Sequence, residues 1–302
     1  MKILLIFTGG TIGSIAKSDY ISPDSKTKYI LTDNFFKKHH NNNEILFDTI
    51  SPYTILSENI TAKHFNMLIS AVRSNLNKGY DGIIITHGTD TLQYTAKALS
   101  LAFEASETPI ILVSSNYTLN DNRANGNENF RCAVDYIASK EAGGVFVSYK
   151  NNADKTARIL PANNLYSHAE MDDKVYSKNC NKSTHISNLH FCDNPKILVI
   201  NSFVGDDYSY DIKDKNAVII RPFHSGTINT ASENLHRFCK SAQHLKIPIY
   251  LVNLPNEINY ESTSIYNELG IIAIKDSLFI PTYVELWAKI SMGIALDDTL
   301  FN

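Results

Sequence analysis

Short apolar runs alternate with longer stretches of helical periodicity over the first half of the chain. The apolar runs have the length of buried strands and lie at residues 2–7, 82–86, 109–114 and 144–148. Between the first two, apolar residues at positions 65, 68, 72 and 76 have the spacing of an amphipathic helix, expected at residues 61–77. Residues 90–104 and 128–140 have helical periodicity as well. Buried strands that alternate with helices are typical of a parallel sheet with crossover helices, so the pattern predicts an α/β fold.

The alternation is interrupted at residues 176–194, where Asn, Lys, Ser, Thr and His dominate. A second α/β pattern follows, with strands near 196–201, 217–221, 248–252 and 271–274 and a helix near 230–243. A last helix is expected to open at Pro281, with Thr282 and Glu285 as its capping box. We therefore predict two domains, a larger N-terminal parallel-sheet domain and a smaller C-terminal α/β domain. Their expected bounds are 1–185 and 196–302, joined by a linker at 186–195.

Composition and charge argue against several classes of protein. The chain has 302 residues, of which 43% are hydrophobic and 20% charged, as in ordinary globular proteins. A net charge of -3 argues against a nucleic-acid or anionic-membrane partner, and no apolar run approaches the roughly 20 residues of a membrane span. Residues 1–7 are too short for a secretory signal, and the four cysteines show no CxxC pair. We therefore expect a cytoplasmic protein with reduced thiols and no metal site.

Two polar motifs directly follow predicted strands: TGGTIG at residues 8–13 and THGTDT at residues 86–91. Open parallel sheets place their ligands at the carboxyl ends of strands, and adjacent glycines let a ligand approach the main chain. Neither motif matches GxGxxG or GxxxxGK[ST], so nucleotide binding has little support. Taken alone, the first motif is equally a strand–helix turn, and Thr89 or Asp90 would cap the next helix. Together, the motifs suggest that Thr11 and Thr89 face one pocket.

TGGTIG followed by THGTDT resembles the asparaginase family, which includes bacterial L-asparaginases of types I and II and the related D subunit of glutamyl-tRNA amidotransferase. The resemblance extends along most of the chain. Residues 15–20 resemble the family's mobile active-site loop, with Tyr20 as its tyrosine. Ser57 and Glu58 stand where the family has a serine and usually a glutamine for the substrate's α-carboxylate and α-amine. Residues 123–129 resemble the family's R-x-D-G-x-x-N segment.

The resemblance implies an amidohydrolase that converts L-asparagine to L-aspartate and ammonia without a cofactor. It implies that Thr11 is the nucleophile, that Tyr20 helps to activate it, and that Thr89 is the second essential hydroxyl. Asp90 would orient a lysine and bind the substrate amine. The implied substrate-binding residues are Gly10, Ser57, Glu58, Gly88 and Asn116. A threonine hydroxyl is a poor nucleophile, so the chemistry also needs a neighbouring charge network and donors for the oxyanion.

The resemblance also implies a homodimer or homotetramer that takes a small amino-acid substrate. In the family, each site lies between the N-terminal domain of one chain and the C-terminal domain of its partner. The HSGTIN sequence at residues 224–229 is then either a plain turn or a loop that lines the neighbouring subunit's pocket.

Several positions depart from the family pattern. The family's lysine position is occupied by Tyr166, unless an insertion lets Lys150, Lys155 or Lys174 reach the site instead. Tyrosine donates a hydrogen bond but supplies no positive charge beside Asp90. Glu58 replaces an amide with a carboxylate, Asn125 replaces an aspartate, and the strand end that usually reads TGAQ or TGSQ is VSSN at 113–116.

These departures leave alternatives open. The chain is an asparaginase-type amidohydrolase, an amidohydrolase for another amide, or a weak or inactive relative that binds an amino acid as a sensor or structural partner. A subunit that acts in tRNA-linked amide chemistry is a further alternative. The near-neutral charge and the lack of an additional N-terminal domain or basic patch disfavour that last possibility.

Overall fold

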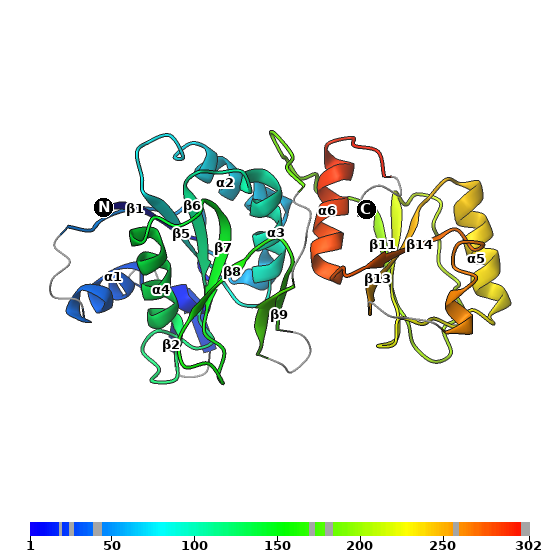
Figure 1. Cartoon of the computed structure of the whole chain (residues 1–302), viewed down its shortest axis with the longest axis horizontal. Helices are drawn as coiled ribbons and strands as arrows, with labels where there is room; N and C mark the ends of the chain where they lie inside the picture. Colours follow the sequence, from blue (N-terminus) through cyan, green and yellow to red (C-terminus); the bar gives the residue numbers. More distant parts are fainter. Residues whose placement is uncertain are drawn as a thin grey trace. The chain divides into compact units, whose positions relative to one another are not determined.

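The computed structural model describes residues 1–17, 20–23, 27–38, 44–168, 173–178, 184–255 and 260–296. Its chain divides into two units, Met1–Leu189 and His190–Asn302. Each unit has its own sheet and its own hydrophobic core (Figure 1). The α/β fold predicted from the sequence is confirmed, whereas the exact bounds of the domains and the linker stay a prediction.

A six-stranded sheet forms the centre of the first unit, with the strand order β4-β1-β5-β6-β7-β8. The first five strands in this order are parallel, and β8 is antiparallel to β7. Their bounds are β1 Lys2–Phe7, β4 Leu46–Ile50, β5 Gly82–Thr86, β6 Pro109–Val113, β7 Gly144–Tyr149 and β8 Arg158–Pro161. Every residue of β5 and β6 is buried, which explains why these strands appear as continuous apolar runs in the sequence.

Helices cover both faces of this sheet (Figure 1). They are α1 Thr27–Lys38, α2 Ala62–Arg73, α3 Leu92–Phe103 and α4 Gly126–Ala138. Leu31 and Phe35 of α1 share one hydrophobic cluster with Phe130 of α4 and with residues of β1, β5 and β6. The α2 and α3 helices contact each other on the opposite face. Two short 3-10 helices, Thr11–Gly13 and Ser57–Asn59, lie in the segments that follow β1 and β4.

Two small antiparallel hairpins complete the first unit. Strand β2 Ser14–Lys17 pairs with β3 Tyr20–Pro23, and β9 Leu165–Ser167 pairs with β10 Val175–Ser177. The segment predicted as a loop with Tyr20 therefore contains strand pairing, which corrects that expectation. Residues 18–19 of the segment lie outside the described residues.

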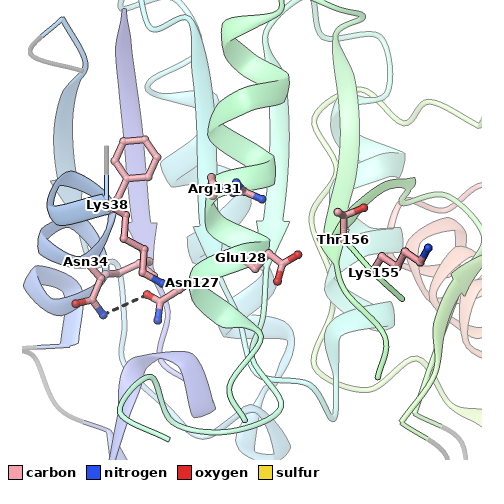
Figure 2. A pocket seen from close by; sticks show the side chains of 9 residues that line it. Asn34, Lys38, Asn127, Glu128, Arg131, Lys155 and Thr156 are labelled. Atoms are coloured by element: carbon pink, nitrogen blue, oxygen red, sulfur yellow. Dashed lines mark hydrogen bonds between the residues drawn. The ribbon is translucent and has the colours of Figure 1, made fainter. Parts of the chain in front are cut away.

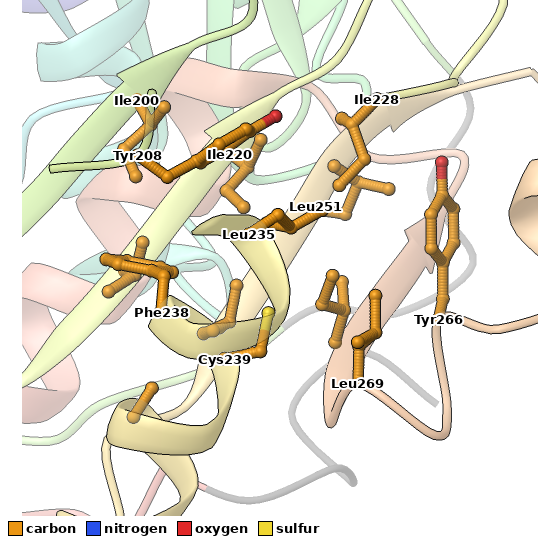
Figure 3. Packing of buried hydrophobic residues seen from close by; sticks show 14 of the residues in the cluster. Ile200, Tyr208, Ile220, Ile228, Leu235, Phe238, Cys239, Leu251, Tyr266 and Leu269 are labelled. Atoms are coloured by element: carbon orange, nitrogen blue, oxygen red, sulfur yellow. The ribbon is translucent and has the colours of Figure 1, made fainter. Parts of the chain in front are cut away.

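The second unit contains a four-stranded parallel sheet with helices on both faces. Its strands, in spatial order, are β11 Ile197–Asn201, β12 Ala217–Arg221, β13 Ile249–Leu254 and β14 Ile271–Lys275. Leu235, Phe238 and Cys239 of α5 Glu233–His244 pack on one face of this sheet (Figure 3). Leu286 of α6 Phe279–Ser291 packs on the other face, against residues of β12 and β13.

The predicted capping box of the last helix is wrong. The helix begins two residues earlier, at Phe279, and its N-cap is Leu278, which makes no side-chain capping bond. Pro281 falls in the first turn, where its missing N–H leaves no hydrogen bond unmade. Glu285 lies inside the helix and forms a buried ion pair with Lys289 at 3.3 Å. The carboxylate therefore serves an i,i+4 pair and not a cap.

The cysteines in the described part of the chain are free thiols. Cys132, Cys192 and Cys239 form no disulfide there, and Cys180 lies outside the described residues. None of the described helices has the length and apolar character needed to cross a bilayer.

Candidate active site

The two glycine-containing turns touch each other at one edge of the first sheet. Strands β1 and β5 are parallel neighbours with Phe7 opposite Thr86, so the chain leaves both strands at the same edge. The Thr8 hydroxyl fastens the turns by donating to the Thr86 carbonyl at 2.6 Å. A Cβ atom on Gly10 would collide with the backbone of Gly88, and Gly10 also has a φ of +73°. Only glycine combines this conformation with so close an approach.

A third segment, after β4, closes around the same turns. Gly10 donates its N–H to the Ile55 carbonyl at 2.9 Å, and Ile55 donates to the Thr8 carbonyl at 3.1 Å. A Cβ atom on Gly88 would collide with the Ser57 side chain, so this serine lies directly against the second turn. The Thr91 hydroxyl donates to the Ser57 carbonyl at 3.0 Å. The three segments therefore form one hydrogen-bonded unit.

The backbone contact makes Thr11 and Thr89 neighbours, because each threonine directly follows one of the touching glycines. Thr11 begins the first 3-10 helix, and Thr89 lies two residues before the N-cap of α3. Both side chains are half-buried. Within the described residues, neither hydroxyl has a hydrogen-bond partner. Each hydroxyl is therefore available to form a hydrogen bond with a ligand.

The charges around the second glycine turn favour a ligand that carries one negative and one positive group. The amino end of α3 begins just after Asp90 and brings the positive partial charge of a helix N-terminus to the turn. Asp90 is exposed and has no ion-pair partner among the described residues. A developing oxyanion and a substrate ammonium group therefore both have complementary groups here. Over the described ranges, no three His, Cys, Asp or Glu side chains are grouped to hold a metal ion.

His87 supports the second turn from inside the protein. Its side chain is buried, with Nδ1 2.8 Å from the Gly88 carbonyl and Nε2 2.7 Å from the Thr95 hydroxyl. A carbonyl only accepts hydrogen bonds, so Nδ1 carries the proton and Nε2 accepts from Thr95. Burial lowers the pKa of His87 to about 4, so this residue is neutral near pH 7. The neutral ring fixes the Gly88 carbonyl next to Thr89.

Acid is expected to weaken the folded state through His87. Its folded pKa lies near 4 and its ordinary value is 6.5, so the unfolded chain binds a proton that the folded chain rejects. The stability is complete above pH 6.5 and falls as the pH drops toward 4, with about 2 kcal/mol lost between pH 7 and pH 4.5. Urea unfolding of the wild type and of His87→Gln at both pH values measures the difference. An equal loss in the two proteins would show that His87 is not held neutral.

The structure brings together three residues that sequence reasoning assigned to the site, Gly10, Gly88 and Ser57. Thr11 and Thr89 directly follow the two glycines. Asn116 follows β6, the neighbour of β5, and is tied to Asn125. The Asn116 N–H donates to the Asn125 side chain at 3.0 Å, and the Asn125 N–H donates to the Asn116 side chain at 3.2 Å. Glu58 is exposed in the second 3-10 helix.

Tyr20 is the residue predicted to help activate Thr11. Its side chain is 61% exposed on β3, and its hydroxyl makes no hydrogen bond with Thr11. The assignment of Tyr20 as an activating residue therefore stays a prediction.

Tyr166 lies on β9 and stacks on another tyrosine. Its ring centroid is 4.7 Å from that of Tyr176, its partner across the β9–β10 pair, with an interplanar angle of 24°. The next residue, Ser167, donates its N–H to the Gln93 side chain at 3.3 Å, which ties β9 to α3. The strand that carries Tyr166 is therefore held against the helix that starts at the Thr89 turn.

None of the lysines considered as a substitute forms an ion pair with Asp90 among the described residues. Lys150 pairs with Glu128 at 2.8 Å, and Lys155 lines a different cavity, between α1 and α4. Sequence reasoning missed another lysine, Lys97 of α3, which is only 5% exposed and donates to the Asn163 side chain at 2.6 Å. Its signal is that it is the one charged residue of α3, a helix that is mostly buried. Lys97 ties α3 to the segment between β8 and β9.

Comparison with known proteins gives a consistent result. The family model "Asparaginase, N-terminal" matches residues 2–194. The D subunit of the glutamyl-tRNA(Gln) amidotransferase of Methanococcus vannielii is 40% identical over 102 residues, which are 34% of this chain and 24% of that protein. Its counterpart in Methanosarcina mazei is 33% identical over 159 residues, 52% of this chain and 36% of that protein. The chain thus matches only about a quarter to a third of the length of these curated relatives.

Solved structures resemble the chain over almost its whole length. L-asparaginase I from Vibrio cholerae has a TM-score of 0.77 at 24% identity, with 97% of this chain and 94% of that chain covered. The thermostable L-asparaginase from Thermococcus kodakarensis has a TM-score of 0.74 at 19% identity, with 96% and 93% covered. At these identities, the likeness establishes the fold alone. The family model covers more than half of the chain and includes both glycine turns, so the chain belongs to the asparaginase family.

Proposed function

We propose that the protein hydrolyses the side-chain amide of L-asparagine to L-aspartate and ammonia, with Thr11 as the nucleophile. The observation that carries the proposal is the backbone contact of Gly10 with Gly88. Thr11 and Thr89 directly follow these two glycines, and neither hydroxyl is bound to another described residue. Membership of the asparaginase family supports the general kind of chemistry, hydrolysis of an amide.

In the first step, the Thr11 oxygen attacks the β-carbonyl carbon, and the carbonyl oxygen becomes an oxyanion. N–H groups at the amino end of α3 suit the stabilisation of that charge. The Thr11 proton passes through the neighbouring Thr89 hydroxyl to the amide nitrogen, and ammonia leaves. Water then attacks the resulting ester carbon. One proton of this water passes to the Thr11 oxygen as the ester bond breaks, and aspartate departs.

The charged end of the substrate has partners on the same edge of the sheet. Asp90 is exposed and unpaired among the described residues, so it suits the α-ammonium group. Ser57, packed against Gly88, suits the α-carboxylate. Glu58 and Asn116 would then select the substrate by charge and by size.

We further propose that the Tyr166 hydroxyl takes the place of the family's lysine as a hydrogen-bond donor to the site. Tyr166→Phe retains the ring that stacks on Tyr176 and removes only the hydroxyl. Turnover is expected to fall by about tenfold or more, with little change in the urea midpoint. Tyr176→Phe is the matched control, since it makes the same change on the stacked partner. Equal turnover of Tyr166→Phe and wild type would assign Tyr166 to packing alone.

The test of the function is ammonia release by the purified protein from L-asparagine, with L-glutamine, D-asparagine and small β-amides in parallel. Release from L-asparagine above all others is expected. Faster release from a different amide would identify that amide as the substrate and contradict the assignment of L-asparagine. No release from any amide, with aspartate still raising the melting temperature, would identify an amino-acid-binding relative instead.

A second candidate function rests on the curated relatives. The identity of 33–40% to the D subunits of two glutamyl-tRNA(Gln) amidotransferases favours a role as an amide-hydrolysing member of such a complex. Ammonia release that depends on added amidotransferase partner subunits would support this candidate. Release by the isolated protein at full rate would favour the first proposal.

We also propose a homodimer or homotetramer located in the cytoplasm. Size-exclusion chromatography with light scattering measures the mass in solution, and a monomer at micromolar concentration would contradict the assembly. Fractionation of the source cells tests the location.

A further inference from the structure

A cavity of about 490 Å³ lies in the first unit, between α1, α4 and the loop from β7 to β8. Leu31, Asn34, Phe35 and Lys38 line it from α1, at the spacing that puts residues on one helix face. Asn127, Glu128 and Arg131 line it from α4, and Lys155 and Thr156 from the loop. Figure 2 shows α1 and α4 side by side with these polar side chains along them. The volume of the cavity is typical of binding sites for small organic molecules.

The walls of this cavity carry excess positive charge. Lys38, Arg131 and Lys155 belong to separate elements, and none forms an ion pair within the described residues. The one carboxylate in the wall, Glu128, is neutralised by Lys150 at 2.8 Å. Cationic side chains that line one cavity repel each other, and a bound anion reduces this electrostatic repulsion. Arginine binds phosphate and carboxylate groups through two parallel hydrogen bonds.

Part of the cavity lining is apolar and preformed. Leu31 and Phe35 belong to the buried core, and the Phe35 ring packs edge-on against Phe130 of α4 with centroids 5.7 Å apart. The Asn34 side chain donates to the Asn127 side chain at 3.3 Å and joins the two helices at the rim (Figure 2). The cavity lining therefore combines cationic side chains with apolar ones.

We infer that this cavity binds a small organic phosphate, with the phosphate group on Arg131 and Lys38 and the organic part toward Leu31 and Phe35. A phosphate monoester carries about -1.5 to -2 charges near pH 7, which suits several cations better than a single carboxylate does. Lys155 also lines the cavity and is exposed, but its ammonium points away from Arg131 and Lys38 in Figure 2, so the phosphate is assigned to the latter two. The site goes beyond the proposed amide hydrolysis and does not include its residues.

Isothermal titration calorimetry with AMP, adenosine and inorganic phosphate tests the inference. AMP is expected to bind saturably, and adenosine and inorganic phosphate are each expected to bind at least about tenfold more weakly. Arg131→Gln and Lys38→Gln are each expected to weaken AMP binding by about fivefold or more. Lys78→Gln removes one charge from an exposed turn of the same unit and serves as the control, with unchanged binding expected.

Three outcomes would overturn the inference. They are no AMP binding at millimolar concentration, equal affinity for AMP and either comparison compound, and wild-type affinity in both the Arg131 and Lys38 variants. Thr11→Val is expected to bind AMP like the wild type. This result separates the cavity from the proposed catalytic site, so that failure of one proposal leaves the other open to its own test.

Discussion

Replacing Thr11 with valine is expected to reduce ammonia release from L-asparagine by about 10³-fold or more. Valine has nearly the shape of threonine, so the half-buried position keeps its packing and loses only the hydroxyl oxygen. That hydroxyl has no hydrogen-bond partner among the described residues. The free energy of unfolding is therefore expected to change by less than about 1 kcal/mol. Initial rates of ammonia release and urea unfolding curves measure the two effects.

Thr89→Val is expected to give a loss of the same order, since both hydroxyls belong to one proton path in the proposed mechanism. The control is Thr49→Val on the exposed edge strand β4, which makes the same chemical change far from the glycine turns. Full activity is expected for this control. A Thr11→Val protein that retains more than a tenth of wild-type turnover would remove Thr11 from the role of nucleophile.

The central strands were predictable because they are buried on both faces. The apolar runs at 2–7, 82–86 and 217–221 coincide with β1, β5 and β12. The edge strand β4 was missed, since its residues are half-buried or exposed and mix polar with apolar types. The β9–β10 hairpin was missed because strands of three residues carry too little pattern to be recognised.

Some features of the proposed site can be predicted from a short stretch of sequence, whereas others depend on contacts between distant segments. Two polar turns after neighbouring parallel strands must meet at one sheet edge, so sequence reasoning could place Thr11 near Thr89. No local pattern, however, reports that Gly10 touches Gly88 or that Lys97 reaches Asn163. These contacts join segments distant in sequence. The first depends on the pairing of β1 with β5, and the second on the packing of α3 against the segment before β9. The same holds for the stacking of Tyr166 on Tyr176.

Replacing Gly10 with alanine is expected to damage both stability and turnover. The added methyl group would collide with the Gly88 backbone, which cannot rotate away as a side chain can. The φ of +73° adds strain for any residue with a Cβ atom. Together these effects are expected to cost about 2 to 5 kcal/mol of unfolding free energy. Any folded fraction would hold the two turns further apart, so turnover is expected to fall by about 100-fold or more.

Gly13→Ala provides a matched control within the same motif. The backbone at Gly13 has no strained φ, and a Cβ atom there would meet only the Thr27 hydroxyl at 3.9 Å, an ordinary contact. Stability and turnover near the wild-type values are therefore expected for this variant. Circular dichroism melting and ammonia release compare the two alanine variants directly. If Gly10→Ala behaves like Gly13→Ala, the close contact between the turns is not required, and Thr11 and Thr89 need another explanation for acting together.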